Sequence, residues 1–164
     1  MSQTKLLARL HSYGIRGDVV KWLQNFLKDR THQTRIGQCL SATADLLSGV
    51  VQGSGIGPVL FLVYIDELAK LLESHGIIVK LFADDVKVYL EIVNVSDTVV
   101  LQGALDLIIE WASTWQLQLS VSKCNMLTIG HIPFDVKYSV LPYVTTSRDL
   151  SIVIATGSLP VSSH

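Results

Sequence analysis

The sequence has few charged residues and only two cysteines for a chain of its length. Lysine, arginine, aspartate and glutamate make up 16% of the 164 residues, whereas apolar residues make up 49%. This composition excludes an intrinsically disordered chain and predicts one domain with a substantial core. Cys39 and Cys124 form no CxxC pair, so we interpret them as two reduced thiols of an intracellular protein.

The start of the sequence lacks the uncharged hydrophobic segment of a signal peptide. Residues 1–14 carry Lys5 and Arg9 inside their apolar pattern. We therefore expect no signal peptide and a location in the cytoplasm or nucleus.

Charge is also absent from residues 46–65, a stretch long enough to span a bilayer. Its first half, however, contains several glycines and Gln52, which a continuous spanning helix would place against lipid. We expect a loop followed by a helix that begins near Gly57 and packs on a sheet. A membrane-spanning helix is the weaker alternative.

The near-neutral net charge conceals an uneven distribution along the chain. Residues 1–40 hold seven basic residues and two acidic residues, and the acidic residues outnumber the basic ones in the remainder. A basic segment can contact a polyanion such as nucleic acid, although a solvated surface explains the same pattern.

Hydrophobic periodicity predicts an α+β fold, with a small antiparallel sheet and helices packed on one face. Residues 4–12 should form a helix that ends at Gly14, and Asp18 should cap the next helix. The expected core stripe of that second helix comprises Val19, Trp22, Leu23, Phe26 and Leu27.

A further helix is expected over residues 59–72. Another, long helix should be capped by Ser96 or Asp97, and its expected buried face comprises Leu101, Leu105, Ile108, Ala112 and Trp115. Strands are expected over residues 31–37, 77–83, 86–92, 124–129 and 150–155.

Two adjacent aspartates, Asp84 and Asp85, lie between two of these strands, and residues 77–92 predict an antiparallel hairpin with the pair at its tip. Two carboxylates about 5 Å apart repel by roughly 3 kcal/mol at an effective dielectric constant near 20, and by under about 1 kcal/mol in bulk water. On an exposed turn the pair is simply solvated. Beside a groove, a divalent cation such as Mg²⁺ would relieve the repulsion.

Five segments in the same order resemble the palm of reverse transcriptases from non-LTR (LINE-type) retrotransposons. They are KLLARLHSYGIRGDVVKWLQNFLKDRTHQTRIG, GVVQGSGIGPVLFLVYIDEL, FADDVKVY, WASTWQLQLSVSKCNMLTIG and SRDLSIVIATGSLPVSSH. The resemblance implies a partial reverse transcriptase domain over residues 1–164. Within it, residues 1–40 would be a basic helix and strand segment, 41–130 the palm core, and 131–164 the late palm strands and tail.

The resemblance also implies roles for residues of the aspartate turn. Asp84 and Asp85 correspond to catalytic, metal-binding carboxylates of the motif, with Mg²⁺ or Mn²⁺ as the cofactor. Phe82 and Ala83 would flank the end of the primer.

Further roles implied by the resemblance fall outside the turn. Gln52 and Gly53 stand where the family contacts the template and the incoming nucleotide. Lys123 stands where such enzymes place a catalytic lysine near the triphosphate, although a plain surface lysine would look the same in sequence. RNA template, DNA primer and dNTP would be the partners, with no membrane.

The sequence departs from the family pattern at several points. It contains no match to the first catalytic aspartate motif, to the fingers that precede it or to a thumb, and Val51 and Val86 replace a usual proline and threonine. These departures predict a truncated, palm-like fold with an incomplete metal site. The alternatives are a non-catalytic nucleic-acid-binding remnant that uses residues 1–40 and a small membrane-associated protein that uses residues 46–65.

Overall fold

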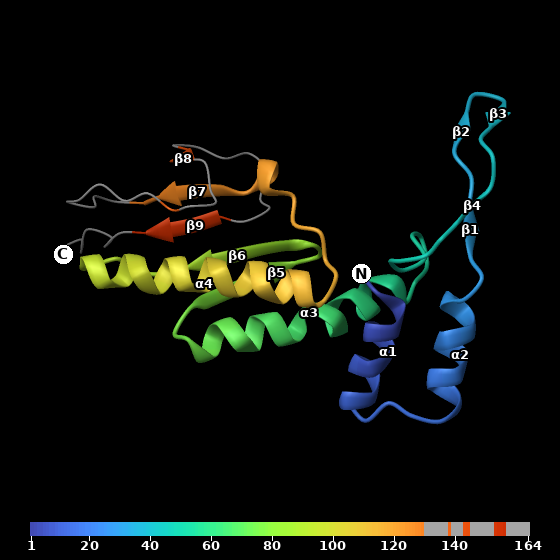
Figure 1. The fold of residues 1–164 in the computed structure, drawn as a ribbon, viewed down its shortest axis with the longest axis horizontal. Helices are drawn as coiled ribbons and strands as arrows, with labels where there is room; N and C mark the ends of the chain where they lie inside the picture. The colour runs from blue at the N-terminus through green and yellow to red at the C-terminus, as the bar shows by residue number, and fades with distance from the viewer. Residues whose placement is uncertain (130–137, 139–142, 145–152, 157–164) are drawn as a thin grey trace, which may run out of the picture. The chain divides into compact units, whose positions relative to one another are not determined.

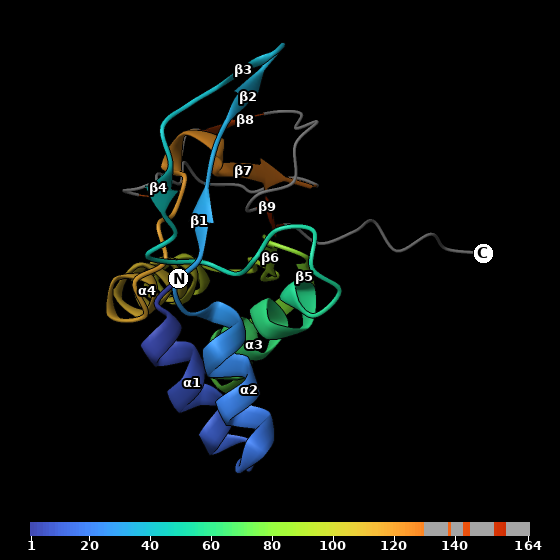
Figure 2. The ribbon, with the colours of Figure 1, turned by 90° about the vertical axis from the view of Figure 1, so that its right-hand side faces the viewer.

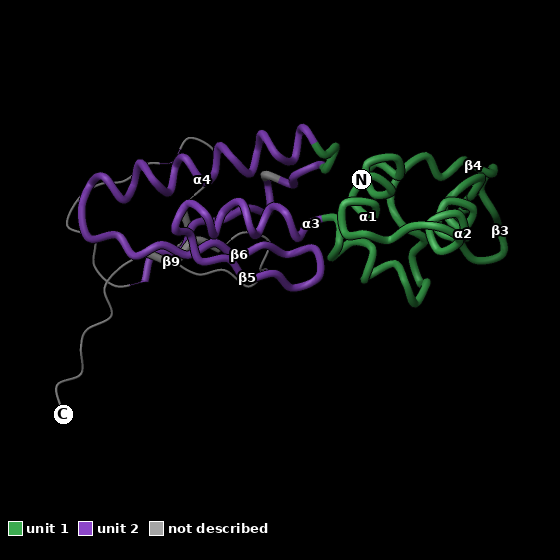
Figure 3. Tube along the Cα trace, turned by 90° about the horizontal axis from the view of Figure 1, so that it is seen from below, with its two compact units in different colours: residues 1–64, 115–117 green, residues 65–114, 118–164 purple. Residues whose placement is uncertain are grey.

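The computed structural model describes residues 1–129, 138, 143–144 and 153–156 of the 164-residue chain. The chain forms two compact units (Figure 3). The amino-terminal unit comprises Met1–Tyr64 and Trp115–Leu117, and the sheet unit comprises Ile65–Thr114 and Gln118–His164. The boundary falls inside helix α3, Gly57–Ser74.

The amino-terminal unit combines two helices with a long, narrow β-ribbon (Figure 1). Its elements are α1 (Gln3–Ser12), α2 (Asp18–Leu27), β1 (Thr31–His32), β2 (Arg35–Ile36), β3 (Cys39–Leu40) and β4 (Ala44–Asp45), followed by the start of α3. The ribbon pairs β1 with β4 and β2 with β3, all antiparallel. One strand was expected over residues 31–37, but the structure has two short strands there, β1 and β2, separated by residues 33–34. Both strands are exposed, and a turn at Gly37 follows β2.

Helix α1 ends as its sequence predicts. Gly14 has φ +79°, its N–H donates to the His11 carbonyl, and the N–H of Ile15 donates to the Leu10 carbonyl. These two bonds satisfy carbonyls that the end of the helix would otherwise leave unpaired, and the positive φ explains the glycine.

The expected cap of α2 is wrong, and its expected buried stripe is confirmed only at Leu23 and Leu27. Asp18 is the first helical residue and pairs with Lys21, while Gly17 occupies the cap position. The buried stripe is Val20, Leu23 and Leu27. Trp22 is 54% exposed and stacks on Phe26 with a ring-centroid distance of 5.7 Å. A helix of ten residues buries only one stripe, and this one buries the stripe one residue further along than the sequence suggested.

The sheet unit contains a five-stranded sheet in the order β5-β6-β9-β7-β8. Its elements are β5 (Ile78–Phe82), β6 (Asp85–Tyr89), α4 (Val95–Thr114), a 3₁₀ turn (Val121–Lys123), β7 (Asn125–Thr128), β8 (Tyr143–Val144) and β9 (Val153–Thr156). The strands expected over residues 77–83 and 124–129 are confirmed. Residues 150–152 of the last expected strand lie outside the described residues.

The five-stranded sheet is mixed, so the expectation of an antiparallel sheet is confirmed only for the β5–β6 pair and for the two-stranded sheets of the ribbon. Among the described strands of the larger sheet, β6–β9, β9–β7 and β7–β8 are parallel. The reason is the crossover helix α4, which returns the chain to the end of the sheet at which β6 began.

Helices cover one face of the sheet, as predicted. Figure 2 shows α4 and the end of α3 on the same side of β5 and β6. The core between them contains Leu68, Leu72, Val79, Val86, Val88, Leu101, Leu105, Ile108 and Met126, all 7% exposed or less. Helix α3 begins at Gly57 after a loop, as expected. Among the described residues, none of the helices has the length and hydropathy needed to cross a membrane.

The start and end of α4 differ from expectation. Asn94 is the N-terminal cap: its side chain accepts from the N–H of Asp97, and the Asp97 carboxylate accepts from the N–H of Asn94 at 2.9 Å and from Val93. This reciprocal arrangement places the cap two or three residues earlier than Ser96 or Asp97, the predicted caps. At the other end, Trp115 lies beyond the helix and packs in the amino-terminal unit, edge-on to Tyr64 and 4.1 Å from the Arg9 guanidinium.

The two free cysteines differ in environment: Cys39 is exposed on the ribbon, whereas Cys124 is buried before β7. Burial raises the pKa of the Cys124 thiol. We predict that a thiol reagent at neutral pH labels Cys39 at least about tenfold faster than Cys124, because the thiolate is the reactive form and Cys124 must first be uncovered. Stopped-flow labelling of the wild type and of Cys39→Ser separates the two phases.

The same pKa shift predicts a pH dependence of stability. Because folding keeps the Cys124 thiol protonated, its contribution is complete below the ordinary thiol pKa and decreases as pH rises through the folded-state value. Urea unfolding at several alkaline pH values should show a shallower decline for Cys124→Ala. An equal decline in both chains would contradict the assignment.

Candidate functional site

The β5–β6 hairpin places the two aspartates at a two-residue turn. Phe82 pairs with Asp85, so Ala83 and Asp84 are the central residues of the turn. Ala83 has φ +51°, a left-handed conformation that disfavours residues with a side chain. The expected hairpin with Asp84 and Asp85 at its tip is confirmed, although β6 ends at Tyr89 and not at residue 92.

The two faces of the hairpin differ sharply. The cross-strand pairs Val79–Val88 and Leu81–Val86 point to the helix-covered face, where Val88 is 0% exposed. Because side chains alternate along a strand, the pairs Phe82–Asp85, Lys80–Lys87 and Ile78–Tyr89 occupy the other face. We call this second set the open face of the hairpin.

The turn offers two carboxylates for a cation. Asp84 is exposed and Asp85 is half-buried. Within the described residues, no group of three or more histidine, cysteine or acidic side chains could hold a metal ion. A pair of adjacent carboxylates still fits Mg²⁺, which in proteins keeps several waters and uses one or two carboxylates together with substrate phosphates.

Lys123 lies at the same end of the sheet as the aspartate turn. Val88 of β6 pairs with Ile154 of β9, which pairs with Met126 of β7. Asp85, on β6, and Lys123, in the 3₁₀ turn before β7, each precede this row by three residues, and the two strands run in the same direction. Figure 1 shows the hairpin turn and the turn before β7 at one end of the sheet. Since neighbouring strands are about 4.8 Å apart, β6 and β7 are separated by roughly 10 Å.

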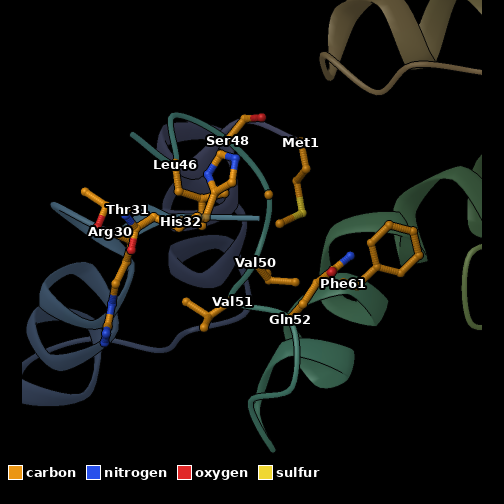
Figure 4. Close-up of a pocket in the computed structure, with 12 residues that line it drawn as sticks. Met1, Arg30, Thr31, His32, Leu46, Ser48, Val50, Val51, Gln52 and Phe61 are labelled. Carbon is orange, nitrogen blue, oxygen red and sulfur yellow. The ribbon is translucent and has the colours of Figure 1, made fainter. Parts of the chain in front are cut away.

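Gln52 and Gly53 belong to the amino-terminal unit, on the loop before α3. Gln52 lines a pocket of about 770 Å³ together with Arg30, His32 and Phe61 (Figure 4). Gly53 has φ +80°, which is sufficient reason for a glycine there. The structure thus joins Phe82, Ala83, Asp84 and Asp85 in one turn, adds Lys123 to the same unit, and places Gln52 and Gly53 in the other unit.

Two lysines beside the turn were missed by sequence reasoning. Lys80 and Lys87 lie directly opposite each other on the open face, one row of side chains from Asp85. The signal was present in the sequence: with a two-residue turn at 83–84, positions 80 and 87 must pair.

Comparisons with known proteins match the sequence of this chain to one family. A family model described as "Reverse transcriptase (RNA-dependent DNA polymerase)" matches residues 2–152. The chain is similar to the RNA-directed DNA polymerase from mobile element jockey of Drosophila funebris, with 27% identity over 87% of this chain, and of Drosophila melanogaster, with 25% identity over 66%. It spans only 15% and 13% of the length of these relatives. No solved structure matches.

The left-handed conformation of Ala83 generates a stability prediction. Replacing Ala83 by glycine should raise the free energy of unfolding by up to about 1 kcal/mol, because glycine adopts positive φ without steric cost. Ala44→Gly is the matched control, since Ala44 lies in an exposed strand, where glycine should destabilise by about 0.5–1 kcal/mol. Urea unfolding measures the free energy of unfolding of both variants. A lower value for Ala83→Gly than for the wild type would show that the turn is not strained at Ala83.

Proposed function

Because the chain belongs to the reverse transcriptase family, we propose that it is part of the palm of an RNA-directed DNA polymerase from a non-LTR (LINE-type) mobile element. The jockey relatives carry the name of such a polymerase. The α+β architecture of the sheet unit, with helices on one face and the aspartate turn at one end, supports the palm assignment. In the intact polymerase, the substrates would be an RNA template, a DNA primer and dNTPs.

The observation that carries this proposal is the aspartate turn itself. Asp84 and Asp85 are held by a paired hairpin whose helix-covered face buries Val79, Val86 and Val88. Their end of the sheet also carries Lys123. A rigid element is the suitable place for groups that must align a nucleophile with a phosphate.

Each residue would have a distinct part in nucleotidyl transfer. Asp84 and Asp85 would hold divalent cations, which supply activation of the primer hydroxyl and neutralisation of phosphate charge when bound. Phe82 is 77% exposed and, with Ala83, would contact the primer end. The Lys123 Nζ would donate a proton to the leaving pyrophosphate oxygen.

A second function is favoured by one specific observation. Since the described residues provide no third metal-binding side chain beside the aspartates, a chain that binds nucleic acid without catalysis is the alternative. The basic residues of positions 1–40 support it. The two functions make different predictions for metal binding and for synthesis.

We predict weak Mn²⁺ binding at the turn, with a dissociation constant on the order of 10⁻³ M. Isothermal calorimetry or Mn²⁺ electron paramagnetic resonance should show this binding and its loss in Asp84→Asn/Asp85→Asn. The matched control is Asp106→Asn/Glu110→Gln, which removes two negative charges from an exposed face of α4. Equal loss in both double variants would indicate only nonspecific attraction to an acidic surface.

We also predict that the 164-residue chain alone extends no primer. With two carboxylates in the turn and, in the part of the chain that the structure describes, no third side chain to bridge the metals, the nucleophile would be misplaced. About 1 Å of misplacement already costs roughly 100-fold in rate. The assay uses an RNA template, an annealed DNA primer, dNTPs and Mg²⁺ or Mn²⁺. Extension that Asp84→Ala/Asp85→Ala abolishes would contradict the prediction and show that another carboxylate, such as Asp45 or Asp66, or one from a partner chain, completes the site.

A further inference from the structure

The open face of the hairpin carries an unfavourable charge pair. Lys80 and Lys87 are directly opposite each other across the two strands. Side chains in such positions have Cβ atoms about 5 Å apart, and like charges there destabilise a sheet. Within the described part of the chain, neither ammonium group has a carboxylate at ion-pair distance. Folding therefore brings two cations together without compensating them.

The neighbours of this pair are suited to a nucleic-acid strand. Phe82 lies on the turn side of the lysines and Tyr89 on the other side, both on the open face. Phe82 and Ile78 are 77% and 59% exposed, and Lys80 is also exposed. Lys87 and Tyr89 are half-buried. Cations beside an exposed aromatic ring are a combination with which proteins bind a phosphate backbone and stack its bases.

The lysine pair also lies at a fixed distance from the aspartates, on the same face of the hairpin. Lys87 follows Asp85 by two residues on the same face, a distance of about 7 Å along an extended strand. Adjacent nucleotides of a duplex strand rise by about 3.4 Å, so 7 Å corresponds to about two nucleotides. A strand whose end lies at the turn would thus bring a phosphate near its end to the lysines.

We propose that Lys80 and Lys87 bind the phosphodiester backbone of the nucleic-acid strand whose 3′ end lies at Asp84 and Asp85. This rests on the function proposed above for the aspartate turn, and it assigns the ligand of the open face beside it. The two ammonium groups neutralise backbone charge and hold the strand in line with the turn. Phe82 contacts its terminal base or sugar.

The first test is the salt dependence of binding. The probe is a fluorescein-labelled DNA primer with a recessed 3′ end, annealed to an RNA template, and the readout is fluorescence anisotropy with the full chain between low and physiological salt. Lys80→Gln and Lys87→Gln should each weaken binding about tenfold at low salt and reduce the slope of log K against log[salt] by about 0.7–0.9. Lys70→Gln, which removes the same charge from α3 in an ion pair with Asp66, should change neither.

The second test uses the like-charge pair itself. Lys80→Glu creates an opposite-charge pair with Lys87, so the chain should melt about 2 °C higher. The same variant should bind the primer–template at least about tenfold more weakly, because one phosphate contact becomes repulsive. A higher melting temperature combined with weaker binding distinguishes a functional pair from a surface that merely tolerates two lysines.

Several outcomes would overturn the proposal. They are no binding by the wild type, unchanged salt slopes in the Lys80 and Lys87 variants, or an equal loss in Lys70→Gln. Capture of an acidic protein segment with no affinity for the primer–template would assign the face to a protein partner instead. Asp84→Asn/Asp85→Asn separates this proposal from the metal site, because it should remove Mn²⁺ binding and leave the lysine-dependent salt slope in place.

Discussion

Burial of the helix-covered face of the β5–β6 hairpin is the constraint on which the site depends. Val88 is fully buried and Val86 nearly so, opposite Val79 and Leu81. A slip of β6 by one residue would turn Val86 and Val88 to solvent and carry Asp85 and Lys87 into the core. Burial of Val79, Val86 and Val88 thus fixes the register. The register in turn fixes the positions of the turn, the aspartates and the lysine pair.

The crossover by α4 extends this constraint across the sheet. Its buried residues hold it against the strands, and its length returns the chain to the end at which β6 started. Strand β7 therefore runs parallel to β6, with Lys123 before it. Asp85 and Lys123, 38 positions apart in sequence, come to the same end of one sheet because a helix connects two parallel strands.

Much of this arrangement was predictable from local signals. The period of two over residues 86–92 and the β-branched residues over 77–83 predicted the hairpin and its turn, although the strand ends at Tyr89. Gly14 predicted a helix end. The mixed sheet was not predictable in the same way, because strand direction depends on long-range pairing of β6, β7 and β9. For α2, several apolar stripes fit one periodicity, and packing alone decides that Val20 is buried while Trp22 is exposed. The candidate site residues were predicted from the resemblance to a family. The pairing of Lys80 with Lys87 becomes evident only from the register of the hairpin.

The most direct test of the central claim is the pattern of Mn²⁺ broadening in amide NMR spectra of the chain. The account predicts that substoichiometric Mn²⁺ first broadens the amide signals of residues 83–85 and then those around Lys123, because both segments lie at one end of the sheet. Signals at the opposite end, around Tyr89 and Thr128, should persist at the same metal concentration. Broadening that begins on α4 at Asp106 and Glu110, or that affects both ends of the sheet equally, would contradict a metal site at the aspartate turn.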